Sequence, residues 1–209
     1  MTTEQCKICR RQGIKLFLKG ERCYGQKCGI VKRNYPPGIR SKRRGKKISE
    51  YGRALMEKQK MRHWYNLSES QFSKYVKNIL DKKERSEGAG DLLVKRIESR
   101  LDNIIFRLGF TLSHRDARQM VNHGHFMVNG RKVDIPSYEV KKGDEIEVKA
   151  GSKKKKEFED IKASLKNFTP PVWLSLDKEG MKVKVLSLPT EEEANVPVET
   201  TVVFEFYSK

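Results

Sequence analysis

Apolar side chains recur at helical spacing in several parts of the chain, and each such stripe predicts a helix with one buried face. The clearest stripe follows Ser68, where Phe72, Val76 and Ile79 repeat every three or four positions. Ser68 and Gln71 form a capping-box pair in front of this stripe, because Gln71 can reach back to the backbone amide of the cap. Similar stripes predict three further helices, at residues 49–65, 97–108 and 157–168.

The pattern changes from helical to extended near the middle of the chain. His125–Val128 and Arg131–Ile135 flank Asn129 and Gly130. An Asn-Gly pair between two such segments is the strongest short-range signal for a β-hairpin. Further strands or extended segments are expected at residues 145–148, 173–176, 182–186 and 202–206.

A short basic helix is expected directly before this hairpin. Ser113 is a suitable N-cap residue, Asp116 lies in the capping-box position, and Gly124 provides the stop. Ala117 and Val121 face one side of this helix. The polar residues on the opposite side are Arg115, Arg118 and Gln119. Helices and antiparallel strands together predict an α+β fold.

The two ends of the chain differ in net charge. The 209 residues carry a formal net charge of +18. Residues 1–60 hold 18 Lys and Arg against 4 Asp and Glu, whereas residues 157–209 hold 6 against 10. This difference in charge indicates that the N-terminal part of the chain binds a polyanion. Nucleic acid is favoured over an anionic membrane, because no amphipathic helix pairs a basic face with a broad apolar one.

The N-terminal segment contains two close cysteine pairs, Cys6 with Cys9 and Cys23 with Cys28. Pairs separated by a loop can place four thiolates around one metal ion. Zinc, an iron–sulfur cluster and two disulfides are all compatible with four cysteines. Zinc is favoured, because a reducing compartment disfavours disulfides and the spacing does not follow ferredoxin patterns. Four protein ligands leave no open position for substrate, so the expected zinc site is structural.

A basic run follows the cysteines. Proline residues before it disfavour helix, and glycine residues keep it flexible. Such a density of cations repels itself unless phosphates neutralise it, which indicates contact with a polyanion; a solvated loop or a localisation signal is the alternative. The cations are Arg40, Lys42, Arg43, Arg44, Lys46 and Lys47.

The basic helix and the hairpin form the principal candidate RNA site. Arginine forks can bind phosphates, and amide side chains can reach base edges or ribose hydroxyls. The two histidines beside Gly124 can stack on bases, or they can serve only in helix-cap and hairpin packing. The candidate residues are Arg115, Arg118, Gln119, His123, His125, Asn129, Arg131 and Lys132.

Catalytic and membrane functions are not expected. The histidines have no acidic or nucleophilic partner in a recognisable constellation, so the sequence does not predict an enzyme or a small-molecule substrate. The longest apolar runs are too short to span a bilayer. The first residues lack the apolar core of a signal peptide, which favours a cytoplasmic protein.

These patterns together resemble a known family. Residues 101–148 are similar to the RNA-binding module named after the fourth protein of the small ribosomal subunit, and the likeness to that ribosomal protein family covers nearly the whole chain. The cysteine spacing matches the members that carry a zinc knuckle. Matching segments outside the module are 15–20, 35–38, 57–60, 98–102, 173–177 and 205–208.

The resemblance implies an architecture in three parts. Residues 1–47 would be a zinc-stapled basic extension. Residues 48–97 with 157–209 would form a helical domain completed by the C-terminal tail. Residues 98–156 would form an inserted RNA-binding module, made of a helix and a β-hairpin, with a basic connector.

The resemblance also implies a function. Such a protein is a structural constituent of the small ribosomal subunit in the cytoplasm. It binds the 5′ domain of 16S rRNA, nucleates subunit assembly and supports translational accuracy. Its implied partners are neighbouring small-subunit proteins, including the fifth, and mRNA near the channel through which it enters.

Two other classes of function compete with this one. An RNA-modifying enzyme could use the same module, but the roughly 60 residues after it are too few for a catalytic domain. A zinc-finger DNA regulator would need a base-reading helix after the cysteines. The cysteines here lead instead into Pro36-Pro37-Gly38.

Overall fold

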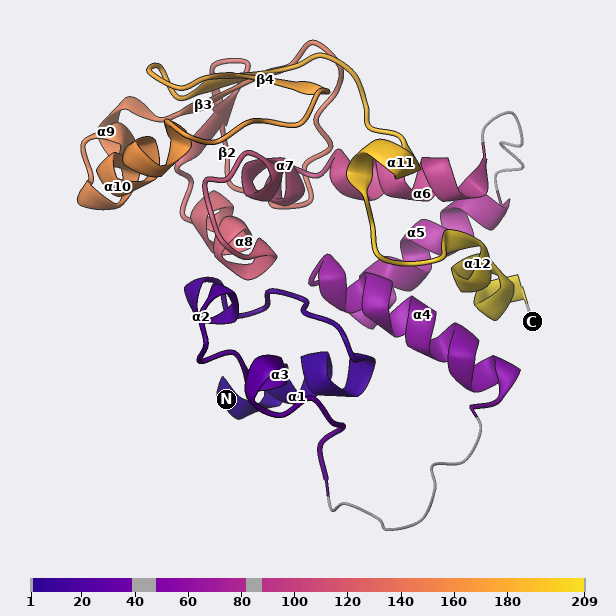
Figure 1. Cartoon of the computed structure of the whole chain (residues 1–209). Coiled ribbons are helices and arrows are strands. Elements are labelled where there is room, and N and C mark those ends of the chain that lie inside the picture. The colour runs from indigo at the N-terminus through magenta and orange to yellow at the C-terminus, as the bar shows by residue number, and fades with distance from the viewer. Residues whose placement is uncertain (1, 39–47, 82–87, 209) are drawn as a thin grey trace. The chain divides into compact units, whose positions relative to one another are not determined.

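The computed structural model describes residues 2–38, 48–81 and 88–208 (Figure 1). The basic run at residues 40–47 lies outside these residues. The chain divides into two compact units, one made of Met1–Gly90 with Val196–Lys209 and the other of Asp91–Asn195. No helix in the described ranges is long and apolar enough to cross a membrane.

The first unit is helical. Its elements are α1 (Thr2–Gln12), α2 (Glu21–Tyr24), α3 (Gly29–Lys32), α4 (Glu50–Trp64), α5 (Glu69–Asp81) and the C-terminal α12 (Thr200–Ser208). The predicted capping box begins α5, because Gln71 N–H donates to Ser68 Oγ at 3.2 Å and Ser68 N–H donates to Gln71 Oε1 at 3.3 Å. Phe72, Val76 and Ile79 are buried on this helix, as their spacing predicts.

Helix α12 corrects the expected strand at residues 202–206. Val203 and Phe204 are buried, and the ring of Phe206 lies 5.5 Å from that of Tyr51 on α4. The Lys58 ammonium lies 4.8 Å from the centre of the Phe206 ring. Packing against α4 therefore overrides the β-propensity of the Val-Val-Phe sequence.

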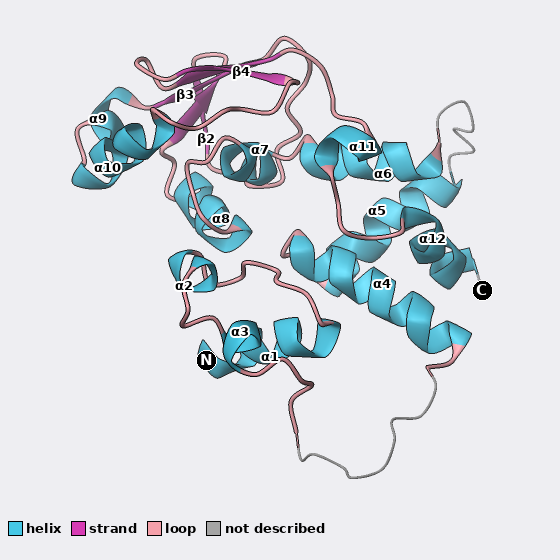
Figure 2. Cartoon of the chain, in the orientation of Figure 1, coloured by secondary structure: helices cyan, strands magenta, loops and turns pink. Residues whose placement is uncertain are grey.

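The second unit is an antiparallel sheet with helices on one face (Figure 2). The sheet order is β2-β1-β3-β5-β4. Its strands are β1 (Phe126–Val128), β2 (Arg131–Val133), β3 (Glu145–Val148), β4 (Leu174–Asp177) and β5 (Lys182–Val185). Its helices are α7 (Leu101–Arg107), α8 (His114–Asn122), α9 (Ala150–Lys153), α10 (Lys156–Leu165) and α11 (Glu191–Ala194), and α6 (Ala89–Glu98) crosses the boundary between the units.

The predicted hairpin forms as β1 and β2, with Phe126 opposite Val133. Asn129 and Gly130 adopt φ angles of 49° and 75°, as a two-residue turn of this kind requires. Strand β3 pairs with β1, which confirms the strand expected at residues 145–148. The α+β fold class is therefore confirmed.

Strands β4 and β5 correct the expected place of the C-terminal segment. Ile146 of β3 lies opposite Val183 of β5, so the later strands extend the sheet of the hairpin. Trp173 is buried in the same core. Residues 157–195 thus belong with the hairpin, and only residues 196–209 join the helical unit.

Two local expectations also need correction. The helix expected over residues 97–108 is interrupted at Ser99 and Arg100, where the backbone pairs with another segment: Val140 N–H donates to Ser99 O, and Leu101 N–H donates to Tyr138 O. The basic connector, for which no helix was expected, includes the end of α9 at Lys153 and the start of α10 at Lys156.

The core of the second unit lies between the sheet and helices α7, α8 and α10. Ile105, Val121, Phe126 and Phe158 are each at most 1% exposed and come from these four elements. Because strand side chains alternate between faces, this core leaves the other face of the sheet to polar residues.

Candidate nucleic-acid interface

The four cysteines approach one another in the first unit. Cys9, Cys23 and Cys28 are buried and Cys6 is half-buried. Burial raises the pKa of the Cys9 thiol, and charge on the other three sulfurs raises it further. A Cβ atom on Gly29 would lie 2.8 Å from the Cβ atom of Cys6, so α1 and α3 are closely packed at this point.

The cysteines suit zinc by chemistry but do not form a finished site. Four thiolates are the ligand set of structural zinc. Across the described residues, however, no group of three or more cysteine, histidine or carboxylate side chains is arranged to hold a metal ion. The structure therefore shows a cluster of free cysteines.

Helix α8 begins as its sequence predicts. Asp116 N–H donates to Ser113 Oγ at 3.2 Å, and Ser113 O–H donates to Asp116 Oδ2 at 2.6 Å. Ala117 and Val121 are fully buried. The cap and the apolar face together fix the rotation of α8, which determines the side chains that reach the surface.

Four predicted RNA-binding residues form one exposed row. Arg115, Gln119 and His123 are exposed and follow one another at intervals of four, so they lie along one side of α8. Lys132 of β2 crosses the end of this helix, because a Cβ atom on Gly124 would lie 2.3 Å from its Cε atom. We call Arg115, Gln119, His123 and Lys132 the basic row.

Arg131 is also exposed, but neighbouring residues of a strand point to opposite faces. Its side chain therefore leaves β2 on the other side from Lys132. Arg131 lies opposite the core residue Val128, and Lys132 lies opposite Met127.

Arg118 is held within the protein. Its guanidinium donates to Asp102 Oδ2 at 3.2 and 3.3 Å. Asp102 is only 3% exposed and also accepts from Arg100, at 3.0 and 2.7 Å, and from the backbone N–H of Asn103. Arg118 therefore joins α8 to α7, a role that its exposed-side spacing did not reveal.

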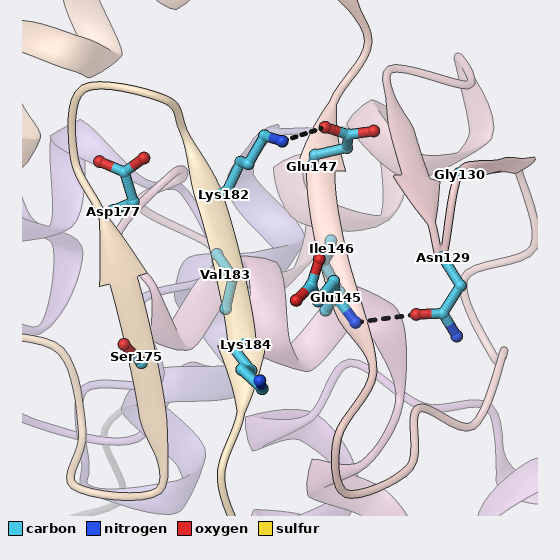
Figure 3. A pocket seen from close by; sticks show the side chains of 10 residues that line it. All are labelled: Asn129, Gly130, Glu145, Ile146, Glu147, Ser175, Asp177, Lys182, Val183 and Lys184. Carbon is cyan, nitrogen blue, oxygen red and sulfur yellow. Dashed lines mark hydrogen bonds and ion pairs between the residues drawn. The ribbon is translucent and has the colours of Figure 1, made fainter.

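Asn129 has its amide engaged in the hairpin. It donates to Asp144 Oδ1 at 2.8 Å and accepts from Glu145 N–H at 2.9 Å (Figure 3 draws the bond to Glu145). These bonds join the β1–β2 turn to the segment that begins β3. Asn129 therefore has a structural role in the hairpin.

His125 is buried, whereas His123 is exposed. The His125 Nδ1 atom lies 2.9 Å from Ser152 Oγ, and its ring lies 5.3 Å from that of Phe158. Burial lowers the pKa of His125, and Lys155 lowers it further. Of the two interpretations of this histidine, the structure favours packing.

His114 is a buried titratable residue that the sequence analysis missed. Its ring lies 3.9 Å from that of Phe106. Burial, followed by the charges of Arg107, Arg118 and Arg100, lowers its pKa to about 3. Its signal was the three-residue spacing to Ala117, which places both residues on the buried face of α8.

The outer face of the sheet carries a polar hollow of about 270 Å³ (Figure 3). The charges in it alternate across strands, and Lys182 Nζ lies 3.4 Å from Glu147 Oε2. Its charged residues are Glu145, Glu147, Asp177, Lys182 and Lys184. With three carboxylates against two lysines, this face is less suited to a polyanion than the basic row.

Two family models match consecutive parts of the chain. Residues 1–96 match the family model described as the ribosomal protein S4/S9 N-terminal domain, and residues 99–146 match the S4 domain. The basic row therefore lies entirely within the S4-domain match.

Similar proteins cover nearly the full chain. The small ribosomal subunit protein uS4 of Thermus thermophilus is 46% identical over 205 residues, which are 98% of this chain and 96% of that protein. The uS4 proteins of Halothermothrix orenii and Syntrophomonas wolfei are 47% and 46% identical and cover 98% and 100% of this chain, and 96% and 98% of their own lengths. The chain belongs to the uS4 family of small ribosomal subunit proteins.

Proposed function

We propose that this chain is a primary 16S rRNA-binding protein of the small ribosomal subunit and that the basic row is its main RNA contact. Members of the uS4 family are structural components of the ribosome and not enzymes. The observation that carries the proposal is the exposed basic row within the segment that matches the S4 domain.

The chemistry of the basic row suits structured RNA. Arg115 can bind a phosphate through two parallel N–H groups, and Lys132 adds a point charge at the other end of the row. Gln119 can reach base edges or ribose hydroxyls, and His123 can stack on an unpaired base. Phosphate contacts would supply affinity, and the middle of the row would supply selectivity for RNA.

The proposed role extends to assembly. The chain would bind the 5′ domain of 16S rRNA in the cytoplasm, nucleate subunit assembly and support translational accuracy. Its neighbours would include the fifth small-subunit protein and mRNA near the channel through which it enters. The run from Arg40 to Lys47 would provide another RNA contact. The resemblance across the whole length supports these finer assignments.

A comparison of ligands tests this function. The protein should bind a folded junction from the 5′ domain of 16S rRNA far more tightly than duplex DNA of equal length at the same salt concentration. If six to ten phosphates are bound, raising salt from about 50 to 200 mM should weaken RNA binding by roughly 10³ to 10⁵. Equal affinity for the two nucleic acids would contradict the proposal.

We also propose that Cys6, Cys9, Cys23 and Cys28 hold a structural zinc ion. Three of these four free cysteines are buried, and Cys9 interacts electrostatically with the other three, which supports this site. Bound zinc would stabilise a segment whose helices α2 and α3 are only four residues long.

Elemental analysis of the purified protein should give about one zinc per chain, and Cys9→Ser should lose most of it. A control, Ser187→Ala, should retain the zinc. Iron with labile sulfide would support the iron–sulfur alternative, and absence of both metals would contradict a metal site.

A further inference from the structure

Asn129 is followed by Gly130, and it is the only asparagine in the chain that precedes a glycine. An asparagine amide can be lost without an enzyme, because the backbone nitrogen of the next residue can attack the side-chain Cγ atom. Glycine has no side chain to obstruct this approach. Both residues are exposed, and even a Cβ atom on Gly130 would meet nothing within 4 Å. The hairpin turn therefore presents to water the two residues that this reaction needs.

The reaction is a deamidation that consumes only water. The Gly130 nitrogen gives up its proton to solvent and bonds to Asn129 Cγ. The bond from Cγ to Nδ2 breaks, and the amide nitrogen takes up a proton and leaves as ammonia. Water then opens the cyclic succinimide at either of its carbonyl carbons. One product is aspartate, and the other is isoaspartate, in which the main chain runs through the former side chain.

Three hydrogen bonds hold Asn129 in an arrangement that opposes this reaction. Its backbone N–H donates to Glu145 O at 2.8 Å. Its Oδ1 atom accepts from Glu145 N–H at 2.9 Å, and its Nδ2 atom donates to Asp144 Oδ1 at 2.8 Å. Figure 3 shows the side chain directed toward β3 and away from Gly130. Ring closure requires the side chain to turn back toward Gly130, so both side-chain bonds must break first.

Asp144 is itself fixed by other parts of the second unit. Its Oδ2 atom accepts from Lys141 N–H at 2.8 Å. Its backbone O accepts from Val185 N–H at 3.1 Å. The carboxylate that Asn129 meets is therefore placed by the turn before β3 and by β5. A hydrogen bond to a charged group is stronger than one between neutral groups, so the bond to Asp144 should provide most of the restraint.

We propose that Asn129 is a site of spontaneous deamidation and that the closed hairpin restrains the reaction, mainly through Asp144. Net hydrogen-bond energies correspond to a slowing of roughly fivefold for the bond to Glu145 and of roughly tenfold to a hundredfold for the bond to Asp144. The reaction should therefore proceed mainly in chains whose hairpin has not formed or has opened. The modification would mark such chains with a covalent change that refolding does not reverse.

Either product would oppose closure of the hairpin. An aspartate at this position would bring a second carboxylate against that of Asp144, and like charges at this distance repel. Isoaspartate adds a methylene group to the main chain between β1 and β2, where the register depends on the length of the turn. Lys132 of the basic row lies on β2, so the modified chain should hold RNA less well. This consequence rests on the proposed rRNA-binding function.

Peptide mass spectrometry of protein incubated at neutral pH tests the site. The measured quantity is the rate at which the peptide that contains Asn129 gains the mass difference between an amide and a carboxyl group. The samples are folded wild type, wild type unfolded in guanidinium chloride, Asp144→Ala and Asp160→Ala. Asp160→Ala removes an exposed carboxylate of α10 and is the control for the change in charge. Asn195 is an internal control, because it also has a positive φ angle, 45°, but is followed by Val196.

The unfolded wild type should deamidate at Asn129 roughly fiftyfold faster than the folded wild type, or more, and folded Asp144→Ala roughly tenfold faster or more. Asp160→Ala should match the wild type, and Asn195 should keep its amide over the same period. Equal rates in folded and unfolded wild type would overturn the inference, and this comparison holds even if Asp144→Ala does not fold. A wild-type rate in folded Asp144→Ala, confirmed by circular dichroism, would overturn the role of Asp144.

Ion-exchange chromatography separates the modified protein from the intact protein for a binding measurement. The modified protein should bind the 16S rRNA 5′-domain junction more weakly and lose about one from the slope of log K against log salt, the share of Lys132. Equal slopes would overturn the consequence for the basic row. Failure of the intact protein to bind the junction would instead contradict the proposed function, and the deamidation rates, which involve no RNA, would still decide the site.

Discussion

A single buried carboxylate, that of Asp102, joins helices α7 and α8. It accepts hydrogen bonds from Arg100, Arg118 and the backbone of Asn103. The sequence indicated that Arg118 was polar and near the RNA-binding side, but the partner is 16 residues away and only folding brings it into contact. A long-range ion pair of this kind leaves no periodic signal in the sequence.

Asp102→Asn should destabilise the second unit strongly. The substitution removes the negative charge between two arginines, one of them 1% exposed, and such a loss costs about 3–5 kcal/mol. Urea unfolding measures the change. Asp134→Asn removes an exposed carboxylate 3.6 Å from Lys132 and should change stability by less than about 0.5 kcal/mol. Similar values for the two variants would show that the buried network is not needed for stability.

His114 should make stability depend on pH. Its pKa is about 3 in the folded chain against about 6.5 when unfolded, so the unfolded chain binds more protons between these values. The stability that the neutral ring provides is complete above about pH 6.5 and falls as pH decreases, by at most about 1.4 kcal/mol per pH unit.

Replacement by a residue that does not titrate isolates this effect. His114→Gln should reduce the loss of stability between pH 7 and pH 5 in urea unfolding. His63, whose pKa is lowered to about 4 chiefly by burial, contributes equally to both proteins. Parallel curves for wild type and variant would contradict a buried neutral His114.

At the scale of elements, local signals were reliable. The capping box at Ser68, the N-cap at Ser113 and the turn at Asn129 depend on residues at most three positions apart, and all three form. The break at Ser99 and the helix at Thr200–Ser208 depend on distant segments. Helix or strand was therefore predictable where neighbouring residues determine the backbone conformation, and not where packing against distant segments determines it.

Asn129→Ala tests the two hydrogen bonds that join the hairpin turn to Asp144 and Glu145. The variant loses the bonds to Asp144 and Glu145 and places alanine at a φ angle of 49°, so it should lose about 1–3 kcal/mol of stability. Asn122→Ala, at an exposed position on α8, should lose much less. Thermal unfolding compares the two variants, and equal melting temperatures would show that these hydrogen bonds contribute nothing to stability.

At the scale of the molecule, the sequence predicted the fold class, the family and a basic N-terminal segment. The sequence-based prediction placed β4 and β5 in the wrong unit. An antiparallel strand can pair with any exposed sheet edge, and the sequence of the strand does not specify which edge it pairs with. The site was predicted in part. Arg115, Gln119, His123 and Lys132 reach the surface together, whereas Arg118, His125 and Asn129 are engaged in internal contacts.

The central claim is that the basic row, and not the hollow that Glu145, Glu147, Lys182 and Lys184 help to line, holds rRNA. Binding of the 16S rRNA 5′-domain junction by two variants of equal charge tests this most directly. Arg115→Gln with Lys132→Gln should weaken binding at least tenfold and reduce the salt slope by about two, whereas Lys182→Gln with Lys184→Gln should leave both unchanged. Weaker binding by the Lys182 and Lys184 variant than by the Arg115 and Lys132 variant would contradict the account.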